Sequence, residues 1–187
     1  MNRVQQLISI IVLLLVSTII AFQIDRPEQA NDSVSWQNEI TVEKNDRVID
    51  QFYNELTNQG KVYIAGKLFG NTSSNANSTN QNFTYISVGN GAAVSPTDSI
   101  LDEEFTSYNL SRSQASSVTS STVGTYTLEK QFTADLSSGP NDITVNTTGL
   151  NYNVSGNSLI SGGNFTEATL TDGDQLTVTH EITISGS

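Results

Sequence analysis

The stretch QLTVTHEITIS, residues 175–185, alternates apolar and polar side chains in the way that is typical of a β-strand with one buried face. The apolar face holds Leu176, Val178, Ile182 and Ile184, and the polar face holds Thr177, Thr179, Glu181 and Thr183. Asp172 and Gly173 come just before it and can form a tight hairpin turn. His180, the only histidine of the chain, falls on the apolar face, which favours a place in or beside the core.

Six more segments upstream combine Thr, Val, Ile and Tyr between turns rich in Gly, Asn, Asp and Ser. The predicted strands are 83–88, 113–118, 125–134, 142–147, 158–160 and 167–170. Many short strands separated by turn signals are typical of an antiparallel β-sandwich and not of alternating βαβ units. The fold is therefore predicted to be mainly β, an antiparallel β-sandwich of the Ig-like or jelly-roll-like kind.

In the residues before 83, the apolar side chains recur with a different period. Val48, Ile49, Phe52, Tyr53 and Leu56 recur every three or four positions, which predicts an amphipathic helix. A second short helix is predicted over 62–68, and the polar run 71–81 is predicted to be a surface loop. Ser95, Pro96 and Asp98 have the pattern of a helix start with a capping box.

Residues 34–42 hold Trp36, Ile40 and Val42 at one parity and follow a polar linker, 25–33. We expect this segment to add as a strand to the edge of a sheet, either in its own subunit or in a neighbouring one.

One strongly apolar segment, 7–22, lies near Met1 behind Arg3. It is shorter than the roughly 20 residues that cross a bilayer core, and close to the length of a signal-peptide apolar region. Two possibilities stay open: a cleaved leader, or a helix that anchors the protein in a membrane. The expected organisation is thus a leader or anchor (1–24), a linker with a possible edge strand (25–42) and a β-sandwich domain with a helical start (43–187). The expected location is extracellular, on a cell surface or on a virion surface.

Composition argues against several classes of function. The net charge of −11 disfavours binding to nucleic acid, whose phosphates would repel the chain. One histidine and no cysteine exclude a cysteine nucleophile and a histidine-cluster metal site. The acidic clusters Asp102-Glu103-Glu104 and Asp172/Asp174 do not match an EF-hand calcium loop, which favours a surface or turn role over calcium binding, and Gly89-Asn90-Gly91 does not make a phosphate-binding loop. The sequence therefore predicts neither an enzyme nor a cofactor.

Eight N-x-S/T sequons are candidate glycan acceptors if the chain is exported. They are Asn31, Asn71, Asn77, Asn82, Asn109, Asn146, Asn153 and Asn164. Asn71 and Asn77, in the predicted surface loop, are the best placed of these.

Arg112 is the only basic residue between Lys67 and Lys130, and it follows an acidic segment. If it is partly buried, its charge needs a carboxylate partner. We expect an ion pair with a residue of 98–104, and with Glu104 in particular.

Several short motifs occur in a fixed order from Asn58 to the end of the chain. They are Asn58-Gln59-Gly60-Lys61 followed by Ile64-Ala65; Tyr85-Ile86-Ser87-Val88-Gly89-Asn90-Gly91; Pro96, Asp98, Leu101 and Glu104; Leu110-Ser111-Arg112; and Phe165, Leu170, Gly173, Asp174, Leu176, Val178, Ile182 and Ile184. This ordered set resembles small β-rich virion or tail-associated structural proteins of tailed phages. The resemblance covers about 130 residues, and each single motif is unspecific.

The resemblance implies a non-enzymatic building block without catalytic residues. Phage tail subunits assemble in the cytoplasm, whereas the apolar segment and the sequons of this chain indicate export. We therefore expect an exported structural subunit of a surface or virion-type assembly, in an archaeon or its virus, that associates with copies of itself or with an assembly partner. Two alternatives stay open: a pilin-like filament subunit whose apolar N-terminal helix forms the filament core, and a cell-surface adhesin.

Overall fold

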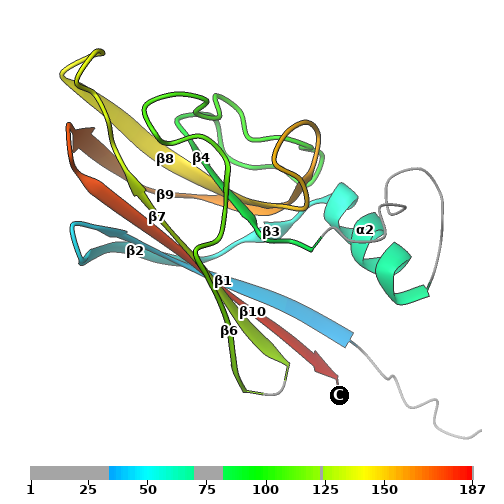
Figure 1. Ribbon diagram of the computed structural model, residues 1–187. Coiled ribbons are helices and arrows are strands. Elements are labelled where there is room, and N and C mark those ends of the chain that lie inside the picture. Colours follow the sequence, from blue (N-terminus) through cyan, green and yellow to red (C-terminus); the bar gives the residue numbers. More distant parts are fainter. Residues whose placement is uncertain (1–33, 70–81, 123, 187) are drawn as a thin grey trace, which may run out of the picture. The chain divides into compact units, whose positions relative to one another are not determined.

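The computed structural model describes residues 34–69, 82–122 and 124–186 (Figure 1). The predicted leader or anchor helix, 7–22, and the sequons at Asn31, Asn71 and Asn77 lie outside these residues. The chain forms two units, Ser35–Ser185 and a second made of Met1–Val34 with Gly186–Ser187. The first unit holds the two sheets and the helix.

The unit is mainly β and contains two five-stranded sheets. Sheet A has the order β2 (Arg47–Tyr53), β1 (Val34–Lys44), β10 (Gln175–Gly186), β7 (Thr125–Thr133) and β6 (Ser117–Thr122). Sheet B has the order β3 (Glu55–Leu56), β9 (Leu159–Thr171), β8 (Asp142–Asn151), β4 (Tyr85–Gly89) and β5 (Ser113–Gln114). The recorded strand pairings are all antiparallel, as predicted.

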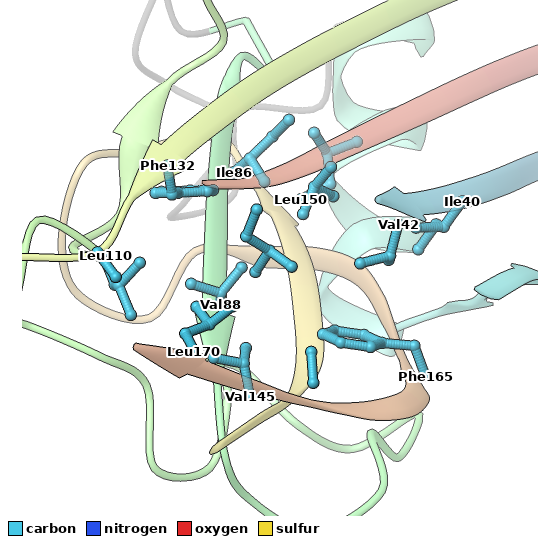
Figure 2. Close-up of a cluster of buried hydrophobic side chains, with 14 of the residues drawn as sticks. Ile40, Val42, Ile86, Val88, Leu110, Phe132, Val145, Leu150, Phe165 and Leu170 are labelled. Carbon is cyan, nitrogen blue, oxygen red and sulfur yellow. The ribbon is translucent and has the colours of Figure 1, made fainter. Parts of the chain in front are cut away.

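Apolar side chains from both sheets form one buried cluster, shown in Figure 2. Sheet A contributes residues such as Ile40, Val42 and Phe132, and sheet B contributes residues such as Leu150 and Phe165. The predicted alternation of 175–185 is confirmed, because Leu176, Val178, His180 and Ile182 are buried. Burying these side chains is the main favourable term that holds the two sheets together.

A single described helix, α2 (Asn58–Phe69), follows β3. Tyr63 of α2 stacks on Tyr152 with their ring centroids 4.6 Å apart, and Ile160 of β9 is buried with them. Gly60 permits this contact, since a Cβ atom built there would lie 2.2 Å from the carbonyl oxygen of Ile160. Since α2 includes residues 62–68, the helix predicted there is confirmed.

The helix predicted over 48–56 is wrong, because most of this segment forms strand β2. Asn45 and Asp46 both have positive φ, 48° and 62°, and link Lys44 to Arg47 in a two-residue hairpin turn. Such a turn matches the twist of paired strands. It directs the chain back along β1, so residues of helical spacing become a strand with Val48 and Tyr53 exposed.

Because of the same hairpin, segment 34–42 does not have the position predicted for it. The segment is a strand in a sheet of its own subunit, which was one of the two alternatives. The expectation that it lies at an edge is wrong, because β1 pairs with β2 on one side and with β10 on the other. β1 also continues without a break past residue 42, where the sequence suggested the start of the main domain.

Three other expectations change in detail. Segments 158–160 and 167–170 belong to one long strand, β9, in which Gly162 and Gly163 allow close approach of Thr148 and Phe52 instead of forming a turn. Segment 113–118 is divided, because the chain passes from β5 in sheet B to β6 in sheet A. In residues 95–98 the Asp98 carboxylate accepts from the Ser95 N–H, as in a capping box, but Ser95 Oγ accepts from the Thr97 N–H, and the residues form a turn that no helix follows.

Candidate interaction surface

Arg112 and Glu104, the pair expected from the sequence, are in direct contact. Arg112 Nε donates to Glu104 Oε1 at 2.8 Å, and Nη2 donates to Oε2 at 2.6 Å. The two side chains are 4% and 15% exposed, so this bidentate pair is largely shielded from water.

The other end of the Arg112 guanidinium binds the loop between β8 and β9. Nη1 lies within hydrogen-bond distance of the carbonyl oxygens of Asn153 and Gly156 and of Ser158 Oγ. An open groove of about 1050 Å³ with the acidic residues Asp98, Asp102 and Glu103 on its wall runs past this cluster. Because the guanidinium is already bound on both sides, its role is to hold two loops together.

The five sequons within the described residues have different surroundings. Asn82 and Asn109 are exposed. The side-chain oxygens of Asn153 and Asn164 accept hydrogen bonds from the backbone N–H groups of Val154 and Val94. Asn146 is half-buried, and its amide nitrogen, the atom to which a glycan would be joined, donates to Gly91 O at 3.3 Å.

His180 lies fully buried between the sheets, in a small polar cluster. Asn38 Nδ2 is 3.0 Å from His180 Nδ1 and 3.2 Å from Ser161 Oγ. Burial lowers the pKa of His180 from 6.5 to about 3, because the charged imidazolium is poorly solvated there. His180 is therefore a neutral core residue at neutral pH.

An apolar groove of about 350 Å³ lies on the inner face of sheet A, at the end where β1 begins and β10 ends. Side chains of four neighbouring strands and of the segment before β4 line it: Trp36, Asn82, Phe83, Thr84, Val118, Tyr126, Leu128, Ile182 and Ile184. Val118, Tyr126 and Ile184 are 54%, 50% and 45% exposed, so this part of the apolar face is incompletely covered.

The groove lies in a part of the sheet without charged residues. No Asp, Glu, Lys or Arg occurs in 113–128, in 33–38 or in 182–187. These segments contain all of β6, the start of β1 and the end of β10. We call this region the uncharged end of sheet A. In a chain with a net charge of −11, the approach of another acidic protein is little opposed at such a surface.

No local sequence pattern predicts this surface. The absence of charge over 113–128 was a visible signal, but Trp36, Tyr126 and Ile184 come from distant positions and meet only when β1, β10 and β7 align.

Comparisons with protein-family models, with curated proteins and with solved structures find no match to this chain. Among the residues that the structure describes, no helix is long and apolar enough to cross a membrane. In the same part of the chain, no group of three or more His, Asp or Glu residues is arranged to hold a metal ion.

Proposed function

We propose that this protein is an exported, non-enzymatic structural subunit that works by binding copies of itself. The observation that carries the proposal is the uncharged end of sheet A, with its half-exposed Val118, Tyr126 and Ile184. Large contiguous apolar patches are uncommon on monomeric proteins and often mark an interaction site.

The two sheets are proposed to form a β-sandwich with the role suggested by the resemblance to virion and tail-associated phage proteins. What supports the sandwich is the common buried cluster to which both sheets contribute. What supports export is the apolar segment 7–22, either as a cleaved leader or as an anchor. The burial of His180, the only histidine, in the core supports a role without acid–base catalysis.

The test is the mass of the full chain in solution, measured by light scattering or analytical ultracentrifugation over a range of concentrations. We expect oligomers, and we expect Ile184→Glu to dissociate them, because it places a charge at the apolar groove. Val48→Glu is the matched control: Val48 is 59% exposed, but it lies on β2, away from the groove. Circular dichroism should show that both variants are folded.

A full chain that is monomeric at all concentrations would contradict the proposal. Equal dissociation by Ile184→Glu and Val48→Glu would show that the groove is not the contact surface. In that case the contact surface would be the segment 1–33 or a face of the sheets away from the groove.

The second candidate is an adhesin, and one observation favours it. Trp36, Phe83 and Tyr126 give the groove an aromatic lining, and its volume is within the range of small-ligand sites. A monomeric chain whose tryptophan fluorescence changes on addition of a small apolar or sugar ligand, and does not change in Tyr126→Ala, would favour this function over assembly.

A further inference from the structure

Sheet A has two outer strands with different properties. β2, at one side, carries Arg47 and Asp50, and Asp50 accepts hydrogen bonds from the backbone and side chain of Thr166 in β9. β6, at the other side, is the last strand of the sheet within the described residues and is paired with β7. The outer strand β2 is thus charged and attached to sheet B, whereas β6 is the terminal strand of the uncharged end.

β6 lacks the charged residues and proline that keep many edge strands from pairing, and its register against β7 is regular over Ser117–Thr119 and shifts between Thr119 and Thr122. Edge strands are commonly protected by lysine, by proline or by inward-pointing charges. β6 reads SVTSST and contains no charged residue and no proline. The nearest charged residues along the chain are Arg112 and Glu129. This edge can therefore accept another strand without burying a charge.

A second copy of the same strand meets the geometric requirement. When a strand pairs antiparallel with its own copy, a two-fold axis relates the two subunits, and each residue makes the same contact in both. The recorded pairs within sheet A are antiparallel, so such pairing continues the existing pattern. Ser and Thr side chains opposite one another across two strands also form favourable pairs.

The charge of the protein is compatible with pairing at the same edge. Two subunits that each carry −11 repel one another. At β6 the facing residues are neutral, and Val118 adds an apolar side chain on the face that carries the groove, opposite Leu128 of β7. Pairing at β6 thus combines new backbone hydrogen bonds, low repulsion and burial of Val118.

We propose that β6 of one subunit pairs antiparallel with β6 of a second subunit, so that two copies of sheet A form one continuous ten-stranded sheet. The proposal rests on the proposed function, self-association, and specifies its partner and contact.

Because the chain has no cysteine, a single introduced cysteine can form a disulfide only with the same position of a second copy. Ser117→Cys, Val118→Cys and Thr119→Cys are made one at a time in the full chain, and each is oxidised under mild conditions. In symmetric pairing, one position near the two-fold axis lies opposite itself, within the separation of about 4.4–6.8 Å between Cα atoms that a disulfide spans. We expect a disulfide-linked dimer from at least one position. Gln51→Cys, exposed on the other outer strand, is the matched control and should not crosslink.

A second variant tests the pairing without touching the groove. Thr119 lies opposite Thr127, on the face away from Val118 and Leu128, so Thr119→Lys leaves the apolar lining intact and brings two like charges together across the paired strands. We expect self-association to weaken at least tenfold in Thr119→Lys and to recover in part at high salt, because salt screens this repulsion.

The outcomes separate the two proposals. Crosslinking at β6 together with the weaker association of Thr119→Lys supports both. Oligomers that crosslink through Gln51→Cys, or that are unchanged in Thr119→Lys, overturn pairing at β6 and leave self-association standing. A full chain that is monomeric and crosslinks at none of these positions overturns both.

Discussion

Asn38 Nδ2 lies 3.0 Å from His180 Nδ1, in the space between the two sheets. An amide nitrogen can only donate, so with the Asn38 amide in this orientation the facing imidazole nitrogen accepts and the ring proton is on Nε2, which has no hydrogen-bond partner within the described residues. Protonation of Nδ1 would place two donors opposite one another in a region that water does not reach. The core therefore selects the neutral imidazole.

The first prediction concerns acid stability. The folded pKa of His180 is lowered to about 3 from an ordinary value of 6.5, so the unfolded chain binds a proton that the folded chain does not. The contribution of the neutral imidazole is complete above pH 6.5 and is lost as the pH falls from there towards 3. The free energy of unfolding should decrease by up to about 1.4 kcal/mol per pH unit in this window. Urea unfolding at pH 7 and at pH 5 measures it.

His180→Gln is the control for this effect, since glutamine is polar and does not titrate. The variant is expected to be less stable than the natural chain at pH 7, but with a flatter dependence on pH between 7 and 5. An equally steep dependence in His180→Gln would assign the acid sensitivity to other groups.

The second prediction concerns the Arg112–Glu104 pair. Arg112→Ala leaves the Glu104 carboxylate and three acceptors of the β8–β9 loop without their donor, which should cost about 3–5 kcal/mol of stability. Arg112→Lys keeps the charge and loses the bidentate geometry, so it should fall between the natural chain and Arg112→Ala. Thermal unfolding measures all three, and an unchanged melting temperature for Arg112→Ala would show that the pair is not stabilising.

The third prediction concerns Asp174, in the turn before β10. Its carboxylate accepts hydrogen bonds from Asn45 Nδ2 and from the backbone and side chain of Thr171, and lies 3.0 Å from Lys44 Nζ. The hydrogen bond from Asn45, followed by the others, holds the pKa of Asp174 well below its ordinary value of 3.8. Its stabilisation is therefore present above pH 3.8 and is lost as the pH falls below that value.

Asp174→Asn should lower stability by about 1–3 kcal/mol at pH 7, since it removes the charge and an acceptor from the turn. The same change at the exposed Asp142 should be nearly neutral. Chemical unfolding of both variants checks this, and equal effects would contradict a specific role for Asp174.

The fourth prediction concerns the docking of α2. A methyl group at position 60 meets the carbonyl oxygen of Ile160, so Gly60→Ala should cost about 1–3 kcal/mol, although alanine favours a helix elsewhere. Val62→Ala, at a position of α2 that is 59% exposed, is the control and should have little effect. Hydrogen exchange should be faster in α2 of Gly60→Ala than in Val62→Ala; equal protection would show that α2 does not depend on this contact.

Local patterns in the sequence were sufficient for most strands and for α2. The alternation of 175–185 predicts both the strand and its buried face, because the period of two is a property of the extended backbone itself. The lone Arg112 after an acidic segment predicts its carboxylate neighbour, because a buried guanidinium requires one.

Only the tertiary structure decided what β2 is and which surface stays open. Residues 48–56 have helical spacing, but the Asn45–Asp46 turn and the ladder with β1 make 47–53 a strand, since hydrogen bonds to a neighbouring strand outweigh a weak local preference. The uncharged end of sheet A depends on the order β1-β10-β7-β6, which brings residues from both ends of the chain together. Strand order is set by the burial of distant side chains against one another, and no local stretch of sequence contains that information.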